Sequence, residues 1–179
     1  LCDLTTLQRE ANRALGYTAQ QTLDYLQALY EKKLCTYPRT DSRFLTDDME
    51  SAVPALVSAA AAVWGLDAPE EILASQVCNS KKVSDHHAVV LTRSAAAADI
   101  AALPLGEREI LRLVSQSLLR AVCPPYRYAE TAVVAECGGH IFNAKGKVLL
   151  DTGWRAYAEL PQDTALPEGL SEGLTLPVE

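Results

Sequence analysis

The apolar residues of this chain change their spacing once, after Cys123-Pro124-Pro125, and that change constrains the fold more than any other feature. Before it, segments such as "LGEREILRLVSQSLLRAV" repeat apolar residues at the spacing of an amphipathic helix. After it, "YAETAVVAECGGHIFNAKGKVLL" alternates apolar and polar residues around a Gly138-Gly139 turn. The sequence therefore predicts an α+β protein, with a mainly helical domain over residues 1–123 and antiparallel β-strands over residues 124–179.

Capping residues mark the first two helices. Thr5 with Gln8 and Thr18 with Gln21 each fit a capping box, in which a hydroxyl and an amide satisfy the first backbone N–H groups. Gly16 is placed to end the first helix, because glycine adopts the left-handed conformation found just after helices. The sequence therefore predicts two short helices before residue 36.

The second helix is expected to end by about Leu34 or Cys35, because Pro38 pushes Tyr37 toward extended backbone. A third helix is expected from Thr46, kinked or shortened by Pro54. The remaining expectations are a short helix near 69–76, a loop entering a strand or short helix over 77–93, a turn and short strand in "DTGWRAY", and a loop tail with room for one more strand.

The formal net charge of −7 argues against a general nucleic-acid binder. The acids are concentrated, however: residues 46–80 hold six acidic side chains and no Lys or Arg, whereas residues 1–45 carry a net charge of +1. A local basic pocket on an acidic body is therefore compatible with the composition. Five scattered cysteines without a C-x-x-C pair favour reduced thiols in a cytoplasm, and no apolar run has membrane-spanning length. The chain begins at Leu1 and is expected to be a piece of a longer protein.

The stretch "TYPRTDS" places a phenol two residues before a guanidinium. In an extended Y-P-R segment, Tyr37 and Arg39 point to the same side and can reach one phosphate. A phenolic oxygen that attacks a phosphodiester conserves the bond as a phosphotyrosine ester, and arginine offers two aligned donors to the charge that develops. The alternative is structural: a tyrosine near a helix end commonly packs its ring and hydrogen-bonds its hydroxyl.

A second polar stretch, "SDHHAVVL", could bind phosphate or transfer a proton through His86 or His87, or could be ordinary polar surface. No phosphate-binding G-x-x-x-x-G-K-[ST] loop and no D-x-D pair for Mg²⁺ occur in the chain. The sequence thus predicts no metal site.

Four stretches taken together resemble type IA DNA topoisomerases, most closely the topoisomerase III branch. "LYEKKLCTYPRTDSRFL" is similar to the active-site segment of that family, and "DLTTLQREANRALGYTAQQTLDYLQALYE" to the helices that lead into it. "SDHHAVVLT" resembles the family's D-A-H-H-A-I-I-P-T, with Asp85 and Leu91 as departures, and "GKVLLDTGWRAY" resembles the following strand and turn. The resemblance covers most of residues 1–157.

The resemblance implies that Tyr37 is the nucleophile that joins the 5′ phosphate of a cut DNA strand, and that Arg39 engages the scissile phosphate. His86 matches a histidine near the bound strand, and His87, the next residue, is a further candidate DNA contact. Charge alone suggests DNA contacts for a further three residues, Arg43, Lys81 and Lys82. The helical part would correspond to domain III of the family and the strands to part of the domain II arch.

The family also requires an N-terminal Toprim domain, which binds Mg²⁺ and supplies the acidic residue for proton transfer. The implied partners are therefore single-stranded DNA and the Toprim and remaining domains of the same polypeptide, in a bacterial cytoplasm and without a membrane. The chain alone is expected to be inactive. The alternative function is a non-catalytic module that binds single-stranded DNA or another protein. A tyrosine recombinase fits less well, because in that class the Arg and His residues precede a tyrosine late in the chain.

Overall fold

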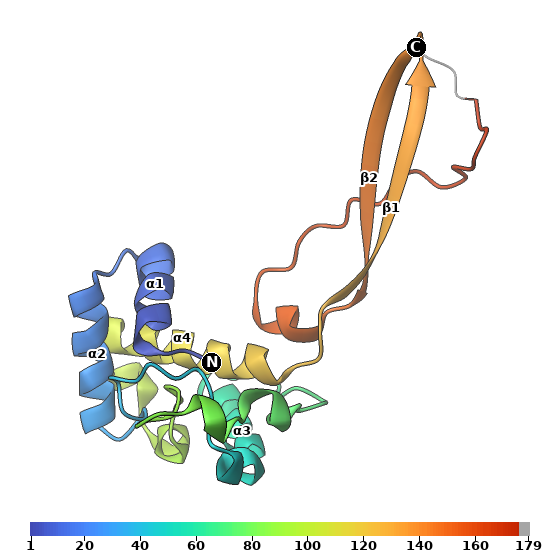
Figure 1. Ribbon diagram of the computed structural model, residues 1–179. Helices are drawn as coiled ribbons and strands as arrows, with labels where there is room; N and C mark the ends of the chain where they lie inside the picture. The colour runs from blue at the N-terminus through green and yellow to red at the C-terminus, as the bar shows by residue number, and fades with distance from the viewer. Residues whose placement is uncertain (176–179) are drawn as a thin grey trace.

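The computed structural model describes residues 1–175 as four α-helices packed together, followed by a long β-hairpin that projects from them (Figure 1). The helices are α1 (Leu4–Leu15), α2 (Ala19–Glu31), α3 (Val53–Val63) and α4 (Leu105–Val122). This arrangement confirms the predicted order of mainly helical structure first and antiparallel strands second.

Helix α4 is the centre of the helical part, since each of the other three α-helices packs against it. Its apolar residues recur at three- and four-residue spacing, so the stripe that contacts its neighbours is continuous. Six of its side chains, together with Leu7 of α1, Leu26 and Leu29 of α2 and Val57 of α3, are buried in one core: Ile110, Leu111, Val114, Leu118, Leu119 and Val122.

One of the two predicted capping boxes is wrong and the other is confirmed. Helix α1 begins two residues earlier than expected, because the side chain of Asp3, not of Thr5, accepts a hydrogen bond from a first-turn amide, that of Thr6, at 2.6 Å. In α2, the Thr18 hydroxyl accepts from the Gln21 amide and the Gln21 side chain accepts from the Thr18 amide. Both devices satisfy N–H groups that have no partner within the helix.

The predicted ends of the next helices are only partly correct. Helix α2 ends at Glu31, a little before the expected boundary, and Lys33 takes a left-handed φ of 60°. Residues from Asp47 form a 3-10 helix, η1 (Asp47–Ala52), and the α-helix starts only at Val53. Pro54 therefore lies in the first turn of α3, where its missing N–H costs no hydrogen bond.

The chain between α3 and α4 contains short 3-10 helices: η2 (Ala74–Val77), η3 (Ser80–Lys82), η4 (Arg93–Ala97) and η5 (Ile100–Ala102). The helix expected near 69–76 is wrong, since only η2 forms there. The segment 83–92 is largely extended and joins other parts of the chain through single bridges, Val89 with Cys2 and Leu91 with Cys35. It contains no regular strand, because each bridge involves a different neighbour.

Strands β1 (Arg127–Cys137) and β2 (His140–Asp151) form the predicted antiparallel hairpin, with Gly138 and Gly139 at positive φ in its turn. Within the described residues no further strand pairs with either one. Large apolar side chains consequently remain exposed on the hairpin: Val134, Ile141, Phe142, Val148 and Leu150.

After β2 the chain returns toward the helices. The short strand expected in "DTGWRAY" is wrong: a 3-10 helix, η6 (Gly153–Tyr157), packs against α4 instead. A side chain at Gly153 would lie 2.5 Å from the Pro125 carbonyl carbon, so this close approach requires glycine. Residues 158–175 contain no strand, and 176–179 lie outside the described residues. Within residues 1–175, no helix is long and apolar enough to cross a membrane.

Candidate active site

The segment around Tyr37 is held in extended conformation by the segment around residue 90. The Thr36 amide donates to the Val90 carbonyl at 2.9 Å, and the Thr36 hydroxyl accepts from the Val90 amide at 3.0 Å and donates to the Ala88 carbonyl at 3.2 Å. These bonds satisfy backbone groups of the buried stretch Ala88–Leu91, which could not otherwise be buried without loss of stability. Residue 36 therefore fixes the backbone immediately before Tyr37.

Two further hydroxyls, those of the buried Thr40 and Ser42, join three distant parts of the chain. The Thr40 hydroxyl donates to the His86 carbonyl at 2.8 Å, and its own carbonyl accepts from the Leu4 amide at the start of α1 at 3.1 Å. The Ser42 hydroxyl lies 2.9 Å from the Lys82 carbonyl. The polar residues of "TYPRTDS" that follow Tyr37 thus position the backbone of the His86 segment.

Tyr37 is half-buried between two other rings. Its ring centroid lies 4.2 Å from that of His86 with the planes tilted by 40°, and 5.5 Å from that of Tyr30 in an edge-to-face arrangement. Aromatic pairs at such separations are favourable beyond the area they bury. The phenol is therefore oriented by packing on two sides, one from α2 and one from the "DHH" stretch.

Arg39 and His86 line one shallow cavity of about 420 Å³ at the start of α1. Three carboxylates also border it, but two of them are engaged: Asp3 caps α1, and Asp41 accepts from the Ser84 hydroxyl at 2.9 Å. The Arg39 side chain is exposed. His86 thus belongs both to the cavity and to the ring contact with Tyr37, and it connects the two halves of the site.

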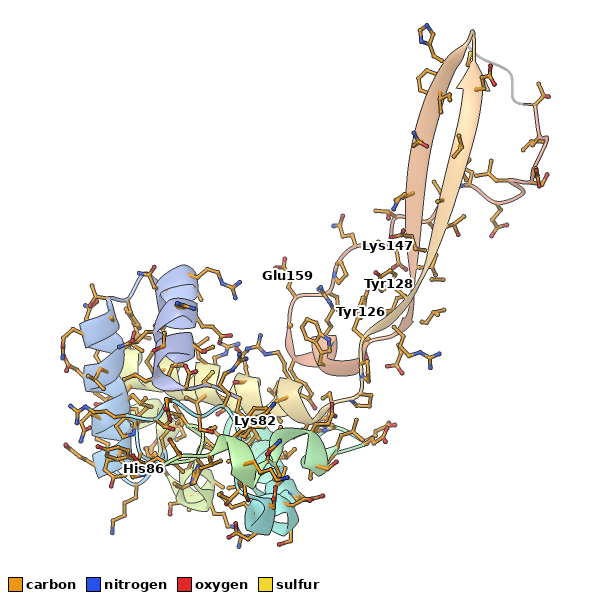
Figure 2. The ribbon with its side chains drawn as sticks, in the orientation of Figure 1. Lys82, His86, Tyr126, Tyr128, Lys147 and Glu159 are labelled. Atoms are coloured by element: carbon orange, nitrogen blue, oxygen red, sulfur yellow. The ribbon has the colours of Figure 1, made fainter. Side chains whose placement is uncertain are left out.

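The remaining candidate residues lie around this centre. Lys81 and Lys82 border an adjacent cavity of about 280 Å³, and the Lys82 ammonium lies 4.6 Å from the Phe44 ring centroid. Figure 2 shows Lys82 and His86 on the helical part of the molecule. Arg43 donates to the Leu1 carbonyl at 3.2 Å, and a ring nitrogen of His87 lies 2.8 Å from the Ala88 carbonyl. Neither of these last two residues lines either cavity.

The structure brings together the two motifs that the sequence singled out, and it adds residues that sequence reasoning missed. Tyr30 was not singled out from the sequence, yet its ring contacts that of Tyr37. Thr36 and Thr40 flank the tyrosine in "TYPRT", and their spacing around Tyr37 was the available signal. Within residues 1–175, no group of three or more His, Cys, Asp or Glu side chains is arranged to bind a metal.

A family model described as DNA topoisomerase matches residues 1–179, the whole chain. The chain belongs to the type IA DNA topoisomerase family. DNA topoisomerase 3 of Bacillus licheniformis is 39% identical to this topoisomerase chain over 99% of the chain and 26% of its own length. DNA topoisomerase 3 of Bacillus subtilis is 39% identical over 91% of the chain and 23% of its own length. These relatives confirm the resemblance to the topoisomerase III branch.

The solved structure of full-length topoisomerase I from Thermotoga maritima has the same fold over the shared region. Its TM-score is 0.68 at 22% identity, and the match covers 93% of this topoisomerase chain and 28% of that structure. The chain spans about a quarter of the length of the curated relatives that it matches. Family and fold are thereby shown for the chain.

Proposed function

We propose that this chain is the part of a type IA DNA topoisomerase that carries the nucleophile, Tyr37. The observation that carries the proposal is the joint placement of the Tyr37 ring on His86 and of His86 with Arg39 in one cavity. The longer protein would cut one DNA strand, pass another strand through the gap and reseal the first. Residues 1–123 would form the helical domain and 124–179 part of the arch.

In the cutting step, the phenolic oxygen of Tyr37 attacks the phosphorus of a single-stranded DNA phosphodiester. The new P–O bond replaces the bond to the 3′ oxygen of the preceding nucleotide, which leaves as a hydroxyl after it takes up a proton. Resealing is the reverse reaction and needs no ATP, because the phosphotyrosine ester retains the energy of the broken bond. Arg39 would donate two hydrogen bonds to the phosphate oxygens as negative charge develops on them.

The other residues support this step. His86 would hold the Tyr37 ring and face the bound strand, whereas Lys81, Lys82 and Arg43 would neutralise neighbouring phosphates. His87, whose ring nitrogen is engaged by the Ala88 carbonyl, would act through the backbone of its own segment. Mg²⁺ and the acid that moves the proton would be supplied by a Toprim domain of the same polypeptide.

The test uses the full-length enzyme and a 5′-labelled or 3′-labelled single-stranded oligonucleotide, followed by a denaturing gel. The wild-type enzyme should retain covalently the label on the 3′ side of the cut, and Tyr37→Phe should form no adduct while keeping its helical content. Tyr30→Phe is the matched control, since it removes the hydroxyl of the neighbouring tyrosine and leaves that of the nucleophile in place. An adduct that persists in Tyr37→Phe would reassign the nucleophile and would leave the non-catalytic DNA-binding module as the better reading.

The 179-residue chain provides a second test. With Mg²⁺ it should neither relax a supercoiled plasmid nor form an adduct that turns over. Relaxation by the isolated chain would show that the whole active site lies within it. It would contradict the proposal that a Toprim domain supplies the Mg²⁺ and the acid.

A further inference from the structure

A row of two cations and three aromatic rings runs along the base of the hairpin. The Lys147 ammonium lies 4.6 Å from the Tyr128 ring centroid, and the Tyr128 and Tyr126 centroids are 5.4 Å apart with the planes tilted by 33°. The Arg155 guanidinium then lies 4.9 Å from both the Tyr126 and the Trp154 centroids. Figure 2 shows Lys147, Tyr128 and Tyr126 gathered where the hairpin meets the helical part. We call these five residues the aromatic row.

The aromatic row is fixed by the chain around it. The Trp154 amide donates to the Pro124 carbonyl at 3.0 Å, and the close approach of Gly153 to Pro125 leaves η6 no room to shift toward that turn. The hydroxyl of Tyr157, at the end of η6, donates to the Asp67 carbonyl at 2.7 Å. These contacts hold the η6 backbone that carries Trp154 and Arg155 in place before any ligand binds, which lowers the entropy cost of stacking on Trp154.

The aromatic row leads into a groove of about 930 Å³ between α1, α4 and residues 154–162. Trp154 and Tyr157 line it on one side. Its charged lining residues are four arginines against two glutamates, a net positive charge in a chain whose total is −7: Arg13, Arg112, Arg120 and Arg155, with Glu10 and Glu159. Positive charge concentrated in a groove, beside stacked aromatic rings, is typical of sites for single-stranded nucleic acid.

The internal contacts of the groove leave two of its cations available. Arg120 donates to the Gln116 carbonyl at 3.1 Å and lies 3.9 Å from the Glu10 carboxylate, so it offsets that negative charge. Arg13 and Arg112 are exposed, and within residues 1–175 neither lies within 4.0 Å of a carboxylate.

Two buried polar atoms in the groove, Arg155 Nε and Glu10 Oε2, also have no hydrogen-bond partner among the described residues. A donor with no partner beside two free guanidinium groups is complementary to a phosphodiester backbone. The Glu10 carboxylate would not contact a phosphate. Its Oε2 atom faces the Arg120 guanidinium at 3.9 Å, and this ion pair explains why a carboxylate is present in the groove.

We propose that this groove and the aromatic row form a second contact for single-stranded nucleic acid, separate from the cavity that Arg39 and His86 line. Arg13 and Arg112 bind successive phosphates, and bases stack on Tyr128 and Trp154. The two sites share no lining residue. The inference rests on the proposed function only for the class of ligand, because a strand-passing enzyme must hold more than one stretch of DNA.

The chain contains two tryptophans, so the test can observe Trp154 alone. Trp64→Phe removes the other indole, and since the Trp64 Nε1 has no hydrogen-bond partner among the described residues, the change breaks no bond there. Titration of this variant of the 179-residue chain with an oligothymidylate of about 12 nucleotides should quench Trp154 fluorescence, because thymine stacks on the indole.

The arginines are tested in the same background. Arg13→Gln with Arg112→Gln should weaken binding about tenfold at low salt and reduce the slope of log affinity against log salt by about 1.4, since each phosphate contact on a single strand contributes about 0.7. The charge-matched control is Arg9→Gln with Arg93→Gln, two exposed arginines outside the groove, which should leave the slope unchanged. An equal loss of affinity in the two double variants would overturn the proposal, because it would show that the oligonucleotide responds only to the net charge of the chain.

The remaining arms separate this site from the Tyr37 site. Tyr37→Phe and Arg39→Gln should leave the Trp154 quench intact, and a quench that either one abolishes would mean that there is a single site. A blunt DNA duplex should quench far less than the oligothymidylate, and equal quenching would contradict stacking. If the adduct assay of the full-length enzyme fails while the quench holds, the proposed function is lost and this site stands.

Discussion

The His86 ring packs on Tyr37, with centroids 4.2 Å apart, while the His86 carbonyl accepts a hydrogen bond from the Thr40 hydroxyl. His86 is therefore held by the segment that carries Tyr37, and its ring in turn orients that tyrosine. The two contacts depend on each other. Loss of the Thr40 hydroxyl would release the His86 backbone, and loss of the His86 ring would remove one of the two rings that pack on Tyr37. Both changes can be tested apart from the nucleophile itself.

His86→Ala should slow adduct formation in the full-length enzyme by about two- to tenfold, because an aromatic pair contributes about 0.5–1.5 kcal/mol. His86→Phe keeps a ring against Tyr37 and should restore the rate but not the affinity for the oligonucleotide, since phenylalanine offers no donor to a phosphate. Single-turnover rates measured over a range of oligonucleotide concentrations separate the two effects. An unchanged rate in His86→Ala would show that the ring contact has no part in placing the phenol.

Thr40→Val removes the hydrogen bond to the His86 carbonyl and the acceptor for the Ser42 amide, which lies 3.1 Å away. Because Thr40 is buried, the cost should be about 1–3 kcal/mol of unfolding free energy, measured by urea denaturation of the 179-residue chain. Ser84→Ala removes an exposed hydrogen bond to Asp41 and serves as the control, with an expected change within about 0.5 kcal/mol. A smaller loss for Thr40→Val than for Ser84→Ala would mean that the bond does not hold the segment.

The sequence predicted those parts of the fold that depend on local pattern. Helix α4 agrees with the predicted segment because its stripe is continuous, and the hairpin follows from strict alternation around two glycines. The cap of α1 was misassigned, since Asp3 and Thr5 are both good caps and only tertiary contacts, such as the bond from the Leu4 amide to the Thr40 carbonyl, select between them.

Prediction failed where the conformation depends on distant partners. The "GWRAY" stretch has a strand-like composition, yet Gly153 fits against Pro125 and the chain turns into η6. The cluster of Tyr37, Arg39 and His86 could be suspected from two motifs but not assembled from them, because the bonds that join their segments link residues far apart in the sequence. The contact between Tyr30 and Tyr37 spans only seven residues, but it depends on how the chain turns after α2, where Lys33 takes a left-handed φ.

Gly106→Ala should destabilise the protein although alanine favours helices. A methyl group at Gly106 would lie within 3.0 Å of three ring carbons of Tyr25, so α2 and α4 would have to separate or the ring would have to move. Overpacking of this kind costs about 1–3 kcal/mol, more than the gain of about 1 kcal/mol from helix propensity. Tyr25→Leu in the same chain should recover much of the loss. A Gly106→Ala protein that is more stable than wild type in urea would show that the ring moves freely.

The buried Cys35 thiol should make the protein sensitive to alkaline pH. Burial raises the pKa of Cys35 from its ordinary value of 9.0 to about 12, because the thiolate would be desolvated. Between these two values the unfolded chain releases the thiol proton while the folded chain keeps it, so the unfolded state binds fewer protons and stability falls as pH rises. The slope contributed by one group is about 1.4 kcal/mol per pH unit at most.

The measurement is the difference in unfolding free energy between the wild-type chain and Cys35→Ala, from urea denaturation at pH 8, 9, 10 and 11 with a reductant present. The difference should be constant up to about pH 9 and then shift in favour of the variant by about 1.4 kcal/mol per pH unit, the maximum slope for one proton.

Tyr17, whose pKa is also raised to about 12 by its hydrogen bond to Glu109, is present in both proteins, so its contribution cancels in the difference. Cys137→Ala is the matched control, because that cysteine is exposed in the hairpin and lies outside the buried core. Parallel curves for Cys35→Ala and wild type above pH 9 would mean that the Cys35 thiolate is solvated in the folded protein, and would contradict the burial of that side chain.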